Sequence, residues 1–144
     1  MAKISDVLKG KGNQVYTIDR GATVYEAIKL MADQNVGGLV VLDNGQLVGI
    51  ITERDYLRKV ILQGKASNTT RVDEIMSDKV VVATPDQSVE ECMAVMAEKR
   101  CRHLPVMDGG RLVGVVSILD LTRQMTKEQQ TTIKYLQDYI YGKY

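Results

Sequence analysis

The segment LVGIITERD, from Leu47 to Asp55, decides the fold because it returns as LVGVVSILD, from Leu112 to Asp120. Each copy is typical of an apolar strand, a hydroxyl residue at the turn, and a helix that carries a carboxylate three residues later. The two copies lie 65 residues apart. The chain is therefore organised around a repeated strand-to-helix junction.

The duplication extends well beyond this segment. Residues 17–55 align without a gap against residues 82–120, and twelve of the 39 aligned pairs are identical. Unrelated sequences of this length share roughly two or three identities, so the two halves are copies of one unit.

The first copy predicts a complete set of elements. We expect a helical turn over 4–8, a loop over 10–13, a strand over 15–18, a helix from Val24 to Asn35, strands over 39–42 and 47–51 around a hairpin turn at 43–45, and a helix over 53–62. Thr23 and Glu26 have the spacing of a capping box. The helical periodicity that follows predicts a buried face made of Val24, Ala27, Ile28, Met31 and Ala32.

The second copy predicts the same order of elements after a polar linker. The expected elements are a turn over 72–76, a strand over 80–83, a helix over 89–100, strands over 104–107 and 112–116 around a turn at 108–110, and a last helix that runs to about Ile140. Ser88 and Glu91 repeat the capping box at the same offset.

These elements predict an α+β fold made of two β-α-β-β-α repeats and a long C-terminal helix. The expected parts are repeat 1 at 1–64, a linker at 65–70, repeat 2 at 71–124 and a helical extension at 125–144. The hairpin strands are apolar on both faces and need cover on both sides. A repeat of about 60 residues also buries too little surface to be stable alone. We therefore expect the two repeats to pack about a pseudo-twofold axis.

Composition excludes several classes of protein. The formal net charge is +1, and the absence of Trp and Phe leaves few aromatic platforms, so we expect no nucleic-acid partner. No apolar window is long enough for a signal peptide or a membrane span. One histidine and two distant cysteines, Cys92 and Cys101, supply no zinc set and no disulfide framework, so we expect no metal and a cytoplasmic protein.

No catalytic motif is present in the chain. It has no G-x-S-x-G elbow, no dinucleotide fingerprint and no complete phosphate loop, so we do not expect an enzyme.

The repeated motifs resemble those of a tandem pair of CBS (cystathionine β-synthase) domains, an arrangement called a Bateman module. Each copy closes with glycine, two apolar residues, Ser or Thr, two further residues and Asp. The supporting pieces are Val24-x-Glu26-Ala27-x-x-x-Met31 with LVVLD over 39–43, and Val89-x-Glu91-x-x-x-x-Met96 with HLPVMD over 103–108. The resemblance covers about residues 4–124 and is to the stand-alone members of the family.

The resemblance implies that adenosyl ligands such as AMP, ADP, ATP, NAD or S-adenosylmethionine bind in clefts between the repeats. Each cleft then combines the closing motif of one repeat with the opening segment of the other. One expected set is Lys11, Tyr16, Val36, Gly37, Gly38, Ser117 and Asp120. The other is Thr52, Arg54, Asp55, Ser77, Val81, Cys101, Arg102 and His103.

The residues alone leave two roles open for the hydroxyl and the carboxylate of each closing motif. As a capping box, the pair binds the free N–H groups at a helix start. As a ligand motif, the carboxylate of Asp55 or Asp120 accepts two hydrogen bonds from the vicinal diol of a ribose. The resemblance favours the ribose role, and the two roles can coexist.

Other candidates also carry two interpretations. Gly37 and Gly38 either allow close approach of an adenine edge or cap a helix. Arg54, Arg102 and His103 are either solvated surface groups or phosphate ligands. Their places within or beside the matched motifs favour phosphate binding, for which the planar guanidinium of arginine is suited because it binds phosphate oxygens bidentately. Leu119 stands where the first copy has Arg54, which weakens the expectation of phosphate binding beside Asp120.

Three functions remain open at the level of the sequence. The first is a regulatory sensor that transmits occupancy by a nucleotide to a protein partner. The second is a ligand-independent dimerisation scaffold, and the third is an unrecognised hydrolase acting on the bound nucleotide. An apolar stripe of Ile133, Leu136 and Ile140, with Tyr135 and Tyr139 beside it, predicts either packing onto its own repeat or a homodimer contact.

Overall fold

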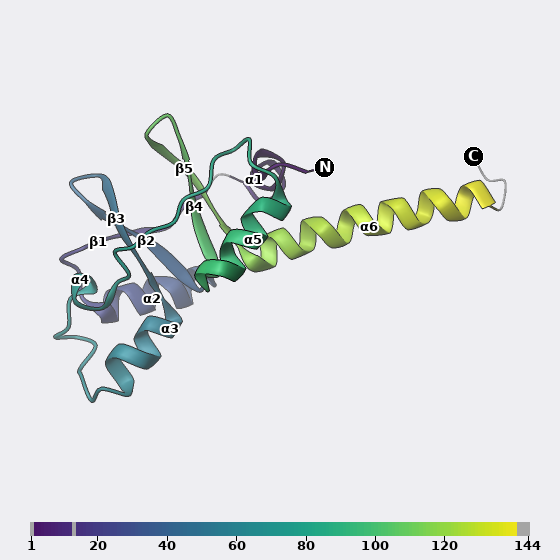
Figure 1. Cartoon of the computed structure of the whole chain (residues 1–144). Coiled ribbons are helices and arrows are strands. Elements are labelled where there is room, and N and C mark those ends of the chain that lie inside the picture. The colour runs from purple at the N-terminus through teal and green to yellow at the C-terminus, as the bar shows by residue number, and fades with distance from the viewer. Residues whose placement is uncertain (1, 13, 141–144) are drawn as a thin grey trace. The chain divides into compact units, whose positions relative to one another are not determined.

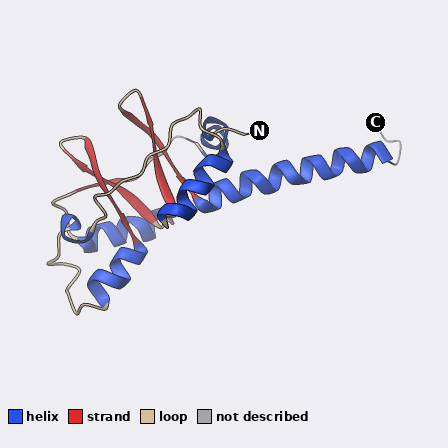
Figure 2. Ribbon diagram, viewed as in Figure 1, coloured by secondary structure: helices blue, strands red, loops and turns tan. Residues whose placement is uncertain are grey.

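The structure, a computed structural model, describes residues 2–12 and 14–140, and the side chains of 138–140 lie outside this description. The chain forms two compact units (Figures 1 and 2). Gln14–Val81 makes up the Asp55 unit, and Met1–Asn13 with Val82–Tyr144 makes up the Asp120 unit. Each is named here after the acid that closes its repeated motif.

The Asp55 unit carries a three-stranded sheet. Its elements are β1 (Thr17–Asp19), α2 (Val24–Gln34), β2 (Gly38–Asp43), β3 (Gln46–Thr52), α3 (Glu53–Tyr56), the π-helix η1 (Leu57–Ile61) and α4 (Val72–Ile75). The strand order is β1-β2-β3, in which β1 is parallel to β2 and β2 is antiparallel to β3. Helices α2 and α3 lie side by side, α2 against β2 and α3 against β3 (Figure 1).

The Asp120 unit carries the equivalent hairpin. Its elements are α1 (Ile4–Lys11), α5 (Val89–Lys99), β4 (His103–Asp108), β5 (Arg111–Ser117) and the long helix α6 (Ile118–Ile140). Strands β4 and β5 form a two-stranded antiparallel sheet. No described helix has the apolar length that a membrane span requires. Both units mix helices and strands, which confirms the α+β class.

The predicted hairpins and helix starts are confirmed. Asn44 and Gly45 have φ of 51° and 78°, the signs of a type I′ turn, which fits the right-handed twist of the two strands. At the helix starts, Thr23 accepts a hydrogen bond from the Glu26 N–H at 3.2 Å, and Ser88 accepts one from the Glu91 N–H at 3.0 Å.

Three expectations about the elements are wrong. No strand forms over 80–83, where Ala83 alone makes a parallel bridge, to Val106. In the first copy the Val40 N–H donates to the carbonyl of Tyr16 at 3.3 Å. Pro105 replaces Val40 in the second copy and has no N–H, so the ladder is shorter there.

The other two wrong expectations concern helices. The expected loop at 10–13 begins later than predicted, because Gly10 and Lys11 continue α1; Asn13 lies outside the described residues. Ala32 is exposed rather than part of the buried face of α2, whereas Val24, Ala27 and Met31 are buried there.

The opening helices do not pack within the repeats that they begin. Helix α1 belongs to the Asp120 unit, where the Ile4 N–H donates to the carbonyl of Gln87 at 2.9 Å. Helix α4 belongs to the Asp55 unit, where the Val72 N–H donates to the carbonyl of Ala22 at 2.8 Å. The compact units therefore differ from the repeats expected at 1–64 and 71–124.

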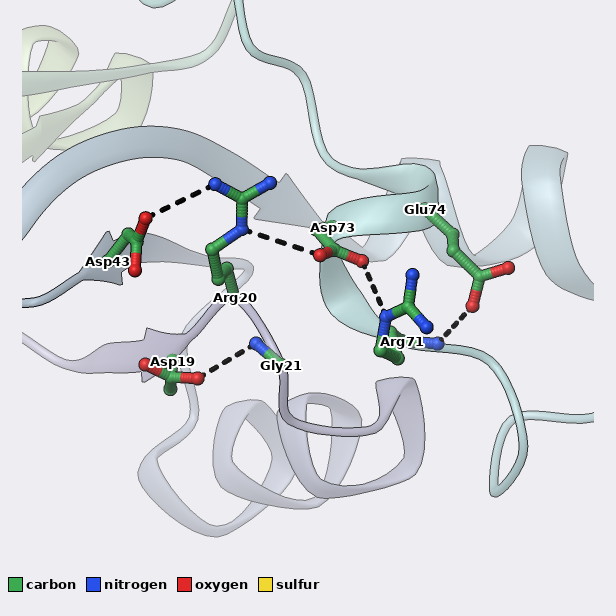
Figure 3. Close-up of polar contacts among 7 residues, drawn as sticks. All are labelled: Asp19, Arg20, Gly21, Asp43, Arg71, Asp73 and Glu74. Atoms are coloured by element: carbon green, nitrogen blue, oxygen red, sulfur yellow. Dashed lines mark hydrogen bonds and ion pairs between the residues drawn. The ribbon is translucent and has the colours of Figure 1, made fainter.

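An ion-pair cluster fixes α4 beside the strand ends of the Asp55 unit (Figure 3). Arg20 lies between Asp43 at 3.3 Å and Asp73 at 3.4 Å, and Arg71 reaches Asp73 at 3.0 Å. The hydrogen bonds to Asp43 and then to Asp73 raise the pKa of Arg20. These pairs are open to solvent and screened by salt, so they orient α4 more than they stabilise the fold.

Two glycines of the repeated segment allow the opening helices to approach the sheets. A Cβ on Gly49 would lie 2.6 Å from the Met76 Sδ and 2.8 Å from the Ser77 carbonyl oxygen. A Cβ on Gly114 would lie 2.5 Å from the Leu8 Cδ2. In both units the glycine is thus required by packing, although the obstacle includes backbone only at Gly49.

We predict that Gly49→Ala lowers the free energy of unfolding by about 1–3 kcal/mol, because the backbone at Ser77 must move. Gly114→Ala is expected to cost less, since the end of the Leu8 side chain can rotate away. Gly10→Ala is the matched control, because that position has nothing within 4 Å and lies in a helix. Urea denaturation of the three variants measures the difference, and equal losses at Gly49 and Gly10 would contradict the packing role.

Candidate functional site

Each unit has a junction at which a strand runs directly into a helix. Strand β3 ends at Thr52 where α3 begins, and β5 ends at Ser117 where α6 begins. The carbonyls of Gly37 and Arg102 accept the first helical N–H groups, from Glu53 at 3.1 Å and from Ile118 at 2.8 Å. The two junctions therefore have the same backbone geometry.

The Asp55 junction is a complete capping box. The Thr52 N–H donates to the Asp55 Oδ2 at 2.9 Å, and the Asp55 N–H donates to the Thr52 Oγ1 at 3.2 Å. The Thr52 hydroxyl also donates to the Asp55 Oδ2 at 3.1 Å. This carboxylate is held by the start of its own helix, which confirms the capping interpretation of the motif.

The Asp120 junction repeats the box and adds a distant partner. The Ser117 N–H donates to the Asp120 Oδ2 at 2.8 Å, and the Asp120 N–H donates to the Ser117 Oγ at 3.1 Å. The Lys11 Nζ, at the end of α1, donates to the same Oδ2 at 2.7 Å and to the Val115 carbonyl at 2.8 Å. Lys11 thus connects the opening helix of the chain to this carboxylate.

A different lysine accompanies Asp55. The Lys59 Nζ lies 3.3 Å from the Asp55 Oδ1 and donates to the Ile75 carbonyl at 2.9 Å. The sequence interpretation missed this residue, although an acid followed by lysine four positions later on a helix is a recognised pair. The contact between Lys11 and the Val115 carbonyl could not be predicted from residue types, because the acceptor is a backbone atom; only the structure shows it.

The environment of Asp120 favours its ionised form. Burial alone would raise the pKa of Asp120, but the hydrogen bonds from Lys11 and Ser117 outweigh it and lower the pKa. Only 12% of the side chain is exposed, so these contacts are weakly screened.

His103 lies opposite Ser117 in the β4–β5 ladder and belongs to the same surroundings. Burial is the largest effect on the pKa of His103, and it lowers that pKa. The negative charge of Asp120 raises the pKa, whereas the positive charges of Lys11 and Arg102 lower it further. The imidazole is therefore mainly neutral near pH 7 and does not add a cation to these surroundings.

The structure divides each predicted set of site residues between the units. The Asp55 unit contains Tyr16, Val36, Gly37, Gly38, Thr52, Arg54, Asp55, Ser77 and Val81. The Asp120 unit contains Lys11, Cys101, Arg102, His103, Ser117 and Asp120. Within a unit, Gly38 lies opposite Thr52 and His103 lies opposite Ser117. Lys11, Ser117 and Asp120 are the members of one predicted set that the structure brings into contact.

The remaining candidates have varied settings. Tyr16 and Val36 pack partly against the core of the Asp55 unit, and the backbone of Ser77 pairs with Ile50 through two hydrogen bonds of 3.0 and 2.9 Å. Arg54 and Arg102 are exposed and free to reach an anion. Among the described residues, no group of three His, Cys, Asp or Glu side chains comes together as metal ligands.

The two cysteines are not activated. Cys92 is a buried core residue on α5, and Cys101 is half-buried. Burial raises the pKa of both thiols, so both are protonated at neutral pH.

Comparison with known proteins identifies relatives of the whole chain. The family model of the CBS domain matches residues 4–62 and again 72–127. The chain is 43% identical to the mitochondrial CBS domain-containing protein CBSX3 of Arabidopsis thaliana, over 98% of this chain and 73% of that protein.

Solved structures agree with the family match. A protein with CBS domains from Burkholderia ambifaria MC40-6 is 48% identical with a TM-score of 0.86, covering 89% of this chain and 96% of that one. The CBS domain pair of protein MJ0100, solved with 5′-methylthioadenosine and S-adenosyl-L-methionine, is 28% identical with a TM-score of 0.78, covering 89% and 98%.

We predict that Asp120 contributes to the acid dependence of folding. Its lowered pKa adds stability above the ordinary carboxyl range near pH 4, and this stability is lost as the pH falls through the folded-state value. Asp120→Asn should therefore flatten the decline in unfolding free energy between neutral pH and about pH 3. Urea denaturation across this range measures it. Parallel profiles for the variant and the natural chain would contradict the assignment.

Proposed function

Because the chain belongs to the CBS domain family as a tandem pair, we propose that it is a regulatory sensor of adenosyl ligands that transmits their binding to a partner protein. The ligand class includes AMP, ADP, ATP, NAD and S-adenosylmethionine. The MJ0100 pair, solved with two adenosyl compounds, supports this class. The observation that carries the proposal is the pair of acids, Asp55 and Asp120, held at equivalent strand-to-helix junctions.

The chemistry of these junctions suits a ribose. A carboxylate held by its helix start presents oxygens in a fixed position, and a vicinal diol supplies two O–H donors. Exposed Arg54 and Arg102 supply the cationic groups that a phosphate requires. These features support a binding module rather than an enzyme. The cytoplasmic location expected from the sequence stays a prediction.

We predict that each acid serves one binding site. Asp55→Ala and Asp120→Ala should each remove one site from calorimetric isotherms with AMP, ATP, NAD or S-adenosylmethionine, and the double variant should bind none. Truncation also removes a helix cap, which costs about 1 kcal/mol of stability, so affinity must be measured on chains that circular dichroism shows to be folded.

Asp33→Ala is the matched control for this experiment, because Asp33 is an exposed carboxylate on α2. In a thermal assay, a ligand present at a hundred times its Kd should add about 2.7 kcal/mol to the free energy of unfolding of the natural chain and of this control. If the calorimetric isotherms of Asp55→Ala and Asp120→Ala match those of the natural chain, the proposed function is rejected. Turnover of a bound nucleotide would favour the hydrolase instead.

A homodimer is the second proposal, and the surface of α6 supports it. Ile133 and Leu136 are 54% and 51% exposed, and Tyr135 is 69% exposed. Among residues with described side chains, this half of the predicted stripe is therefore not packed onto its own repeat; the side chains of Tyr139 and Ile140 lie outside the description. Apolar residues at helical spacing on an exposed face favour contact with a second helix.

We predict that Leu136→Glu shifts the chain towards the monomer, because a charge in an apolar contact is costly to desolvate. Thr131→Glu is the matched control: it adds the same charge to an exposed position of α6, on the face opposite Ile133 and Leu136. Light scattering after size exclusion measures the mass at several concentrations. A dimer that survives Leu136→Glu as well as it survives Thr131→Glu would exclude α6 as the contact.

A further inference from the structure

We propose that Lys11 makes the Asp120 site selective for adenosine ligands that carry a 5′-phosphate, by moving from the carboxylate to the phosphate when the ribose binds. This inference rests on the proposed function and narrows its ligand class at one of the two acids. It concerns only residues of the Asp120 unit.

Lys11 is held by two acceptors at the end of β5. Its Nζ donates to the Asp120 Oδ2 at 2.7 Å and to the Val115 carbonyl at 2.8 Å, and 34% of its side chain is exposed. An ammonium group on a flexible stem can exchange partners without movement of the backbone. The lysine is therefore both bound to the carboxylate and able to leave it.

A ribose diol and Lys11 compete for the same oxygen. The Asp120 Oδ2 already accepts hydrogen bonds from the Ser117 N–H and from Lys11, which together use both of its lone pairs. A diol that donates to both carboxylate oxygens must displace one of these donors. The Ser117 N–H is part of the helix cap and is fixed by the backbone, so Lys11 is the donor that leaves.

The displaced lysine keeps the Val115 carbonyl but loses its anionic partner. Separating a half-buried carboxylate from its cation is unfavourable, because the two charges attract strongly where water is partly excluded. A neutral ligand such as adenosine offers no anion in compensation. A 5′-phosphate offers oxygens that bind an ammonium group as a point charge. The ligand class is therefore a nucleoside 5′-phosphate.

The Asp55 junction lacks this arrangement, which makes the two units chemically different. There the backbone of Ser77 pairs with Ile50, the residue equivalent to Val115. Lys59 donates to the Ile75 carbonyl at 2.9 Å and lies 3.3 Å from the other carboxylate oxygen, Oδ1. At this junction the Asp55 Oδ2 accepts from the Thr52 N–H and the Thr52 hydroxyl, so the donor that a diol displaces there is a neutral hydroxyl and not an ammonium group.

The test compares AMP with adenosine by titration calorimetry on the full chain carrying Asp55→Ala, which leaves the Asp120 site. We expect AMP to bind roughly tenfold or more tightly than adenosine, since a hydrogen bond between charged groups is worth about that factor. Adding Lys11→Met should weaken the affinity for AMP by roughly tenfold. The affinity for adenosine should stay equal or become tighter, so that the preference for AMP disappears. Lys11→Arg should restore it.

Lys59→Met is the matched control, because it neutralises the cation beside the other acid and should leave the preference intact. If circular dichroism shows that the Asp55→Ala chain is unfolded, the Lys11 variants are compared in the natural chain. The preference for AMP over adenosine should then be lost at one of the two sites. A preference that survives Lys11→Met, or an equal loss of AMP and adenosine affinity, overturns the inference. Failure of the natural chain to bind AMP also overturns the inference, whereas failure to bind AMP, ATP, NAD and S-adenosylmethionine alike rejects the proposed function.

Discussion

The structure of each unit depends on one constraint: a strand that continues into a helix without a loop must supply acceptors for the first helical N–H groups. A hydroxyl and a carboxylate three residues apart meet this need at both junctions. The same bonds fix the carboxylate in place. The repeated acid is thus held by the capping contacts of its own helix before any ligand is considered, and the binding role that we propose uses the same fixed carboxylate.

The two junctions differ because of residues outside the repeated segment. Helix α1 has eight residues and ends at Lys11, whereas α4 has four and ends at Ile75. The shorter helix lets the chain extend, so that the backbone of Ser77 pairs with Ile50. The longer helix brings a lysine side chain to the equivalent place on β5. A difference in helix length therefore becomes a difference in charge beside one acid. Leu119 weakens the expectation of phosphate binding beside Asp120, and in our proposal Lys11 supplies the cation that Arg54 supplies in the first copy.

Much of this architecture was predictable because it depends on local chemistry. Asn44 and Gly45 specify a tight hairpin, and Thr23 and Ser88 specify helix starts, in each case through contacts within a few residues. The packing of α1 and α4 was not predictable, because no local signal says which sheet a short apolar helix covers. Pro105 indicates that the ladder is shorter in the second copy, but the strand over 80–83 was predicted from its apolar run alone.

In the candidate site too, contacts within a few residues were predictable and contacts between distant residues were not. The capping contacts of Asp55 and Asp120 are local and were found from spacing alone. The pairing of Lys11 with Asp120 joins residues 109 positions apart, and the resemblance rather than the chemistry suggested it. Lys59 was missed despite a local spacing that indicates it.

One helix connects the acid to the exposed apolar surface. Asp120 lies in the first turn of α6, and Ile133 and Leu136 lie roughly four turns further along the same 23-residue helix. In our proposal, a change in how the first turn of this helix is held would move its far end as well. Continuity alone does not make a sensor, because a ligand shifts a conformational equilibrium only by its differential affinity for the two states. Lys11 supplies a source of such a difference: it links α1 to α6 through Asp120, and a ligand that takes the carboxylate breaks that link.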